Sequence, residues 1–267
     1  MDNIIGMMWN YNEADVLEEV IRAALPHVDS LFIADDNSKD NSWEIIQSLK
    51  KMYPDKIEYI RNKRADPRDQ GQRQSLLNEI RKRYKPENSW VQIIESDIMI
   101  LDTNIREALK DFAQQDLGMS WQTLNAAREP GTWKEADTYP EWDKSITEIM
   151  PLAHWIEVML YTFRPLPDLA YNLDTWKPWP QGFAKYSTGE LTFGRRCLNA
   201  PLLAHYGYRG PTHMYLKNKH LDSHRKYTSW RFDSPEVVEE TVYFFNGIWN
   251  NGLFPMSREG WINWRKG

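Results

Sequence analysis

With 267 residues, 41% of them hydrophobic, the chain is long enough to bury a substantial core, as one large domain or two small ones. The 33 basic and 38 acidic residues give a net charge of −5, which excludes a broad basic footprint for duplex nucleic acid and leaves a local basic groove open. The single cysteine, Cys197, excludes an internal disulfide and a cysteine-based zinc site.

Targeting signals are not evident in the sequence. The first 15 residues lack a basic region followed by a long apolar run, and no window approaches the roughly 18 apolar residues of a membrane span. We therefore expect a cytoplasmic protein, and peripheral contact with the inner membrane face is left open.

The first half of the chain alternates between strand and helix patterns. Short apolar runs predict four strands, at Ile4–Trp9, Ser30–Ala34, Ile57–Ile60 and Trp90–Ile94. Apolar residues at helical spacing predict a helix after each of the first three strands, and these residues are Val16, Leu17, Val20, Ile21 and Ala24, then Trp43, Ile46 and Leu49, then Leu76, Leu77, Ile80 and Tyr84. Asn12 is a candidate cap for the first helix, and Pro54 closes the second.

This alternation predicts an α/β fold with a mostly parallel, open sheet, right-handed crossovers and helices on both faces. Polar clusters follow the four strands: "NYNE", "DDNS", "RNKR" and "ESD". The carboxyl ends of parallel strands lie at one edge, where such sheets bind ligands, so we expect the four clusters to share that edge.

Asp35 and Asp36 stand side by side directly after the second strand. Asp, Asn and Ser favour turns and helix caps, so a structural role explains "DDNS" alone. A helix cap does not explain four polar clusters at one edge, and a ligand-binding role is the alternative.

Glu95 and Asp97 flank one residue, so in an extended segment both carboxylates point the same way. The sequence has no Gly-rich phosphate loop, no H-E-x-x-H and no G-x-S-x-G, and phosphate would have to be held through a metal. Carboxylates suit Mg²⁺ or Mn²⁺ bridging substrate phosphates. Solvent-facing acids at a strand end are the alternative.

Together, "NYNE", "ADDNS", "DQGQRQSLLNEIR" and "ESD" resemble the nucleotide-sugar half of the family 2 glycosyltransferases with the GT-A fold, over residues 1 to about 125. The family usually has V-D-D-G-S and D-x-D at the second and fourth positions. The resemblance implies the following donor-site roles: Glu13 and Asp36 contact the nucleoside, Arg73 reaches the base or diphosphate, Glu95 meets the ribose, and Asp97 ligates the metal. Asn12 and Asp35 belong to the same donor-binding group, with Asp35 mainly supporting the loop.

In the second half, residues 126–267, the segments "LYTFRPLPDLAYNLDTW" and "LLAHYGYRGPTHMYLKNK" resemble, more loosely, members of that family that extend lipopolysaccharide cores and other surface glycans. The resemblance implies a general base at Asp174, where the family has His-Glu, with Glu190 as the alternative. A carboxylate that accepts the acceptor hydroxyl's proton contributes about 10² to 10⁴ in rate. A cap or ion-pair role for Asp174 is the structural alternative.

His205 follows an apolar run and is expected to join Asp97 as a metal ligand, with a buried core histidine as the alternative. His220 and His224 lie four residues apart among many charges, which indicates a solvated surface face. Trp176 and Trp179, in a Pro- and Gly-containing loop, are expected to bind the acceptor by stacking on a sugar ring or a nucleobase.

These expectations describe one compact catalytic domain: a Rossmann-like nucleotide-sugar half over residues 1–125, and an α+β acceptor half over 126–267 with a helical, aromatic-rich tail. Its predicted function is metal-dependent transfer of a sugar from a nucleoside diphosphate to a hydroxyl acceptor, with inversion. The acceptor is expected to be a glycan, and a modified nucleic-acid base is left open. The alternatives are a catalytically silent nucleotide-sugar or glycan-binding module and a sugar nucleotidyltransferase.

Overall fold

The computed structural model describes part of the 267-residue chain. The described residues are 2–61, 69–100, 105–110, 118–127, 151–171, 180, 202–208 and 215–216. The chain divides into two compact units, one made of Met1–Gln122 and Val158–Leu202, the other of Thr123–Glu157 and Leu203–Gly267. The first unit thus includes a segment that the sequence assigned to the acceptor half, and the functional boundary near residue 125 stays a prediction.

Strands and helices alternate through the first hundred residues, as the sequence predicts. In chain order the elements are β1 (Asn3–Asn10), α1 (Ala14–Ala24), β2 (Ser30–Asp35), α2 (Ser42–Met52), β3 (Ile57–Arg61), α3 (Asp69–Arg83), a 3₁₀ turn (Pro86–Asn88), β4 (Ser89–Glu95), β5 (Ile98–Ile100), α4 (Ile105–Lys110), β6 (Gly118–Ala127), β7 (Pro151–Phe163) and β8 (Leu202–Tyr208). All four predicted strands and all three predicted helices of this region are confirmed.

The first unit contains a sheet with neighbours in the order β3-β2-β1-β4-β7. The first four strands run parallel, and β7 joins β4 antiparallel. The core strands β1, β2 and β4 are apolar along most of their length and almost wholly buried, as expected when helices cover both faces of a parallel sheet. The predicted α/β class with a mostly parallel sheet is confirmed.

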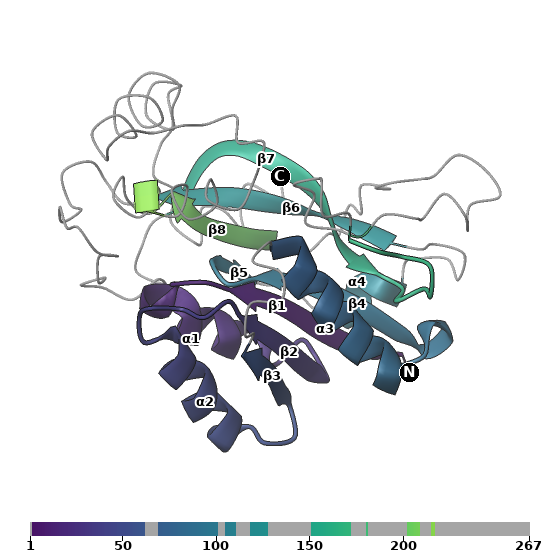
Figure 1. Cartoon of the computed structure of the whole chain (residues 1–267). Helices are drawn as coiled ribbons and strands as arrows, with labels where there is room; N and C mark the ends of the chain where they lie inside the picture. Colours follow the sequence, from purple (N-terminus) through teal and green to yellow (C-terminus); the bar gives the residue numbers. More distant parts are fainter. Residues whose placement is uncertain are drawn as a thin grey trace. The chain divides into compact units, whose positions relative to one another are not determined.

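The strand order also determines which face each helix covers. Right-handed crossovers from β1 to β2 and from β2 to β3 place α1 and α2 on one face, and the return from β3 to β4 places α3 on the other. In agreement, α1 packs on α2, whereas α3 packs on β1 and β2. Figure 1 shows α1 next to α2, with α3 running separately along the strands. The order in which strands are added to the sheet therefore reverses between β1 and β4, although the two strands run parallel.

The start of α1 corrects one prediction. The helix begins at Ala14 with Glu13 at the N-cap position, so Asn12 is not the cap. Asn12 instead has φ of 52°, in the left-handed region that Asn adopts more readily than most residues. Its side-chain oxygen accepts a hydrogen bond from the backbone N–H of Lys39 (2.6 Å), and Asp40 Oδ2 accepts from the N–H of Ala14 (3.0 Å). The first helix is thus capped by the loop after β2.

None of the helices within the described ranges has the length and apolar content needed to cross a bilayer. The part of the predicted acceptor half from residue 172 to residue 267, which includes the aromatic tail, lies almost entirely outside the described residues.

A buried polar pair joins β7 to the parallel strands. Gln92 and Thr162 are register partners, both fully buried, and Thr162 Oγ1 donates to Gln92 Oε1 (2.6 Å). Gln92 Nε2 donates to the carbonyl of Ile93 (2.7 Å). A shift of one residue would break this bond, so the pair helps to specify the register between β4 and β7.

Replacing Thr162 by valine should therefore lower the free energy of unfolding by about 1–3 kcal/mol, because the buried Gln92 oxygen loses this donor. Urea unfolding of the parent, Thr162→Val and Thr162→Ser measures the effect. The serine variant keeps the hydroxyl and should lie closer to the parent. A valine variant with the same free energy of unfolding as the parent would show that the bond between Thr162 and Gln92 does not stabilise the pairing of β4 with β7.

Candidate functional site

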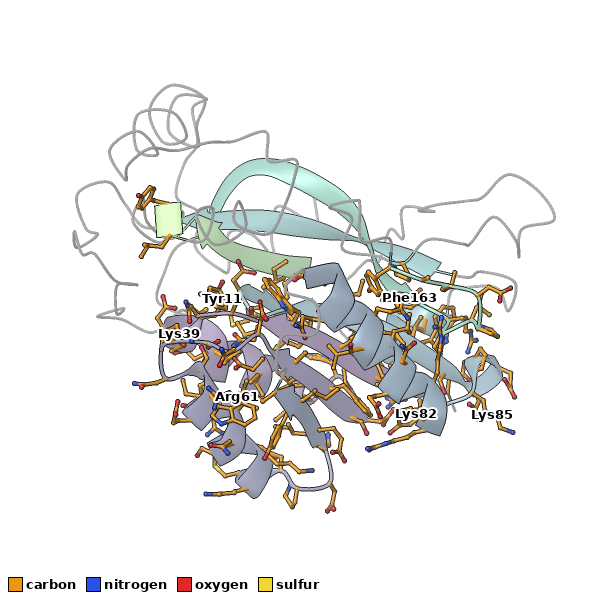
Figure 2. All side chains as sticks on the ribbon, in the orientation of Figure 1. Tyr11, Lys39, Arg61, Lys82, Lys85 and Phe163 are labelled. Atoms are coloured by element: carbon orange, nitrogen blue, oxygen red, sulfur yellow. The ribbon has the colours of Figure 1, made fainter. Side chains whose placement is uncertain are left out.

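Three of the predicted polar clusters meet at the carboxyl edge of the parallel strands. The register pairs Asn10 with Asp35, Trp9 with Glu95, and Asp35 with Arg61, so these strand ends lie level. In Figure 2, Tyr11 and Lys39 lie at this end of the sheet, while Lys82 and Lys85 lie at the opposite end. The prediction of a shared edge is confirmed for "NYNE", "DDNS", "ESD" and Arg61, and residues 62–64 lie outside the described part.

Asp35 is the centre of a buried hydrogen-bond network between the loops after β1 and β2. Its Oδ1 accepts from Asn10 Nδ2 (2.9 Å) and from the hydroxyl of Ser38 (2.6 Å), and its Oδ2 accepts from the N–H of Ser38 (3.1 Å). The Ser38 hydroxyl also accepts the backbone N–H of Asn12 (3.0 Å). Asp35 is fully buried, and its carboxylate thus supports both loops.

Burial raises the pKa of the Asp35 carboxyl above its ordinary value, because desolvation penalises the charged form. The hydrogen bonds from Ser38 and Asn10 and the charge of Arg61, whose Nε lies 3.8 Å from Oδ2, act in the opposite direction and lower the pKa less than burial raises it. A direct contact of Asp35 with a sugar nucleotide stays a prediction.

Asp36 is held differently from its neighbour. Its backbone N–H donates to the carbonyl of Asn10 (2.9 Å), which continues the β1–β2 pairing by one residue. Its Oδ1 accepts from Gln72 Nε2 of α3 (3.3 Å), and the side chain is fully buried. Asp36 therefore lies between the end of β1 and the first turns of α3.

Helix α3 also brings Arg73 to the edge. Arg73 Nη2 lies 2.8 Å from Glu95 Oε2, and the two side chains are 5% and 15% exposed. The guanidinium also stands over the ring of Trp9, 5.8 Å from its centroid. The family resemblance implies separate donor contacts for Arg73 and Glu95, whereas in the structure the two side chains pair with each other. Their contacts with a donor stay predictions.

Two further predicted site residues are almost completely buried at this edge. Glu13 is 1% exposed and follows β1, and its backbone N–H donates to the Ser42 hydroxyl (3.1 Å). Asp97 is 3% exposed and lies in the turn between β4 and β5. Three buried acids, Glu13, Asp36 and Asp97, thus come from three different loops of the carboxyl edge.

Several side chains of this edge have structural roles that the sequence did not predict in full. Gln72 and Trp9 contact the predicted residues, and Ser38 and Asp40 hold the loops together. Ser38 belongs to the "DDNS" cluster, for which the sequence offered a structural turn or cap role, and its position three residues after Asp35 is typical of local side-chain-to-backbone bonding. No local pattern indicates Gln72 or Trp9.

Two buried polar atoms at the end of β1 have no hydrogen-bond partner within the described residues, Trp9 Nε1 and Asn10 Oδ1. Such groups are uncommon in folded proteins, because each costs about 1–3 kcal/mol. Their position next to the buried acids makes this edge the candidate ligand-binding site.

The remaining predicted site residues lie outside the described part: Asp174, Glu190, Trp176 and Trp179, together with His220 and His224. His205 belongs to β8, but its side chain is not among those described. Among the described residues there is no group of three His, Cys, Asp or Glu side chains that could hold a metal ion.

Comparison with known proteins identifies a family. The model of glycosyl transferase family 2 matches residues 7–162, more than half of the chain. No curated protein matches the chain.

Solved structures match with low identity. The TarS protein of S. aureus in complex with UDP-GlcNAc is 15% identical, with a TM-score of 0.32, over 50% of this chain and 37% of that one. The mannosyltransferase PcManGT from Pyrobaculum calidifontis in complex with GDP-Man and Mn²⁺ is 18% identical, with a TM-score of 0.34, over 48% of this chain and 36% of that one. The chain therefore matches less than half of the length of these structures.

The raised pKa of Asp35 predicts how stability depends on pH. The folded carboxyl keeps its proton to a higher pH than the unfolded one, whose ordinary value is 3.8, so the folded state binds more protons between the two values. The free energy of unfolding should fall as pH rises through this window, and Asp35→Asn removes this dependence.

Denaturant unfolding of the parent and of Asp35→Asn between pH 4 and 7 measures this difference. We expect the stability of the parent relative to the variant to decline as pH rises. A parent that instead gains stability relative to the variant would mean that Arg61 and the hydrogen bonds outweigh burial.

Proposed function

The chain belongs to glycosyl transferase family 2, and from that premise we propose that it transfers a sugar from a nucleoside diphosphate to a hydroxyl acceptor. The observation that carries the proposal is the gathering of Glu13, Asp36 and Asp97, all nearly or fully buried, at the carboxyl edge of the parallel strands. That edge is also where the strand order reverses, between β1 and β4. Open α/β sheets bind their ligands at such a point.

Asp36 and Glu13 are the proposed contacts of the nucleoside. Both follow strands whose ends are level, and the bond from Gln72 fixes one oxygen of Asp36. A carboxylate held in this way can accept hydrogen bonds from the base or the ribose without a large loss of side-chain entropy. The pairing of Arg73 with Glu95 supplies a cation and an acid side by side, suited to a diphosphate and a ribose hydroxyl.

Asp97 is the proposed metal ligand. Mg²⁺ and similar hard ions are commonly held by one or two carboxylates together with substrate phosphates, so a single buried carboxylate at this edge fits such an ion. When bound, the ion would neutralise negative charge on the diphosphate leaving group. Asp97 would fix the diphosphate's position through the ion, and Arg73 lies near enough to the same edge to add positive charge.

The acceptor hydroxyl needs a base, because an alcohol is a poor nucleophile until a carboxylate accepts its proton. We propose Asp174 for this role, with Glu190 as the alternative, and Trp176 and Trp179 as acceptor contacts. Direct attack by the acceptor oxygen on the face opposite the leaving diphosphate would form one bond as the other breaks. Such a displacement inverts the configuration at the anomeric carbon.

Asp36→Asn should weaken the binding of nucleoside diphosphates about 10- to 10²-fold, because hydrogen bonds to a charged group contribute about 1.5–3 kcal/mol. The melting temperature should stay near that of the parent, since the asparagine oxygen can still accept from Gln72. Calorimetry with UDP and GDP measures the affinity.

Asp55→Asn, which alters an exposed carboxyl between α2 and β3, is the matched control and should bind as the parent does. A large loss of stability in Asp36→Asn with unchanged affinity would assign Asp36 a purely structural role.

Turnover of nucleotide sugars tests the function itself. In the presence of Mn²⁺ the parent should release nucleoside diphosphate from at least one sugar nucleotide of a panel, and a chelator should abolish the release. Asp97→Asn should reduce it more than about 10³-fold, because a metal contributes several kcal/mol to the transition state and each ~1.4 kcal/mol is tenfold.

Glu87→Gln, an exposed carboxyl in the turn before β4, is the control and should leave turnover unchanged. Binding without any turnover by the parent would support a silent nucleotide-sugar-binding module instead. Turnover of Asp97→Asn at the parent's rate would contradict the metal assignment.

A further inference from the structure

The segment that follows β7 is fastened along α3 by side chains that the proposed function does not use. This segment, residues 164–171, is called the return segment below. Arg81, in the last turn of α3, donates from Nε to the carbonyl of Pro165 (3.3 Å), and its Nη2 donates to the carbonyls of Leu166 and Leu169. One guanidinium thus binds three backbone carbonyls of the return segment.

A second contact lies nearer the start of α3. The backbone N–H of Tyr171 donates to Gln74 Oε1 (2.8 Å), and Gln74 Nε2 donates to Asn78 Oδ1 (2.8 Å). Leu169 and Tyr171 are 1% and 4% exposed, so their side chains are packed in the protein at this end of the return segment. Gln74 therefore holds the last described residue before position 172.

The return segment begins at a fixed point. Arg164 donates to the carbonyls of Pro86 and Ser89 (3.2 and 3.3 Å), and its guanidinium stacks on Trp90 at 3.9 Å from the ring centroid. Pro165 and Pro167 restrict the backbone between the two ends. The return segment is thus anchored at its start, its middle and its end.

The direction of the return segment leads it toward the candidate site. Helix α3 begins at the carboxyl edge, after β3, and ends at the amino edge, before β4. In chain order, the return segment contacts Arg81 near the end of α3 and then Gln74 near its start. It therefore runs antiparallel to α3, toward the carboxyl edge. Gln74 directly follows Arg73, which contacts Glu95, and lies about 1.5 Å along the helix axis from it.

We propose that Gln74 and Arg81 are positioning residues for sugar transfer, which hold the return segment so that the chain re-enters the carboxyl edge at Tyr171. The inference rests on the proposed function, in which Asp174 is the base. Asp174 follows Tyr171 by three residues in the sequence, so only a short stretch of chain separates the proposed base from the anchor. An anchor at Tyr171 therefore limits where the base can be.

This role predicts a specific kinetic pattern. Loss of the anchor should lower kcat, because a displacement of about 1 Å can cost up to about 10²-fold. The affinity for nucleoside diphosphate should not change, since Asp36 is held by Gln72 and by the end of β1 and not by the return segment. A change in general stability alone would alter neither quantity at a temperature where the variant is folded.

Gln74→Leu and Gln74→Glu form a matched pair. Leucine removes the acceptor of the Tyr171 N–H, whereas glutamate keeps it. We expect Gln74→Leu to release nucleoside diphosphate from sugar nucleotides with Mn²⁺ about 10- to 10²-fold more slowly in kcat, with an unchanged Kd for UDP or GDP, and Gln74→Glu to keep most of the turnover.

Arg81→Met should show the same loss of kcat, with Arg83→Met as its control. Arg83 is exposed on the same helix and pairs with Glu58 (3.1 Å), which lies in β3 and not in the return segment. Its replacement should leave kcat at the parent's value.

Hydrogen exchange of the peptides that cover the return segment, including the amide of Tyr171, gives a readout that does not depend on activity. These amides should exchange faster in Gln74→Leu than in the parent and in Gln74→Glu. Unchanged exchange and unchanged kcat in Gln74→Leu would overturn the proposal, and so would a loss of nucleotide affinity equal to the loss of kcat. Absence of turnover in the parent would contradict the proposed function, and the exchange comparison would then decide on the anchor alone.

Discussion

The buried carboxylate of Asp35 is the constraint on which the rest of the site depends. A fully buried acid is unfavourable unless donors surround it, and here Asn10 and Ser38 supply them. Because these donors come from two loops, the bonds that satisfy the carboxylate also fasten the loop after β1 to the loop after β2. Asn12 and Asp40 complete the connection, so the two loops act as one support for Asp36 and Glu13.

Helix α3 supplies the second side of the same edge. Its first turns carry Gln72 and Arg73, which contact Asp36 and Glu95. Further along the same helix, Gln74 and Arg81 hold the chain after β7. A single helix thus contacts both the proposed donor residues and the segment after β7. Sites built on helices and strands are held more precisely than sites built on loops alone.

The sequence predicts features that depend on neighbouring residues. Apolar runs give β1, β2 and β4, helical spacing gives α1, and parallel pairing then places the polar clusters at one edge. Features that join distant residues are not predictable in this way. The cap of α1 comes from Asp40, 26 residues away, the Arg73–Glu95 pair spans 22 residues, and the Arg81 contacts span more than 80. Asn12 resembled a cap because its residue type suits both a cap and a left-handed turn.

Family membership and the geometry of the carboxyl edge together support one account, in which this edge binds the sugar nucleotide. A crystal structure of the chain grown with Mn²⁺ and a nucleoside diphosphate tests this claim most directly. The account predicts density for the nucleoside beside Asp36 and Glu13, and for the ion and diphosphate beside Asp97 and Arg73. A nucleotide bound at the opposite end of the strands, near Lys82 and Lys85, would contradict it.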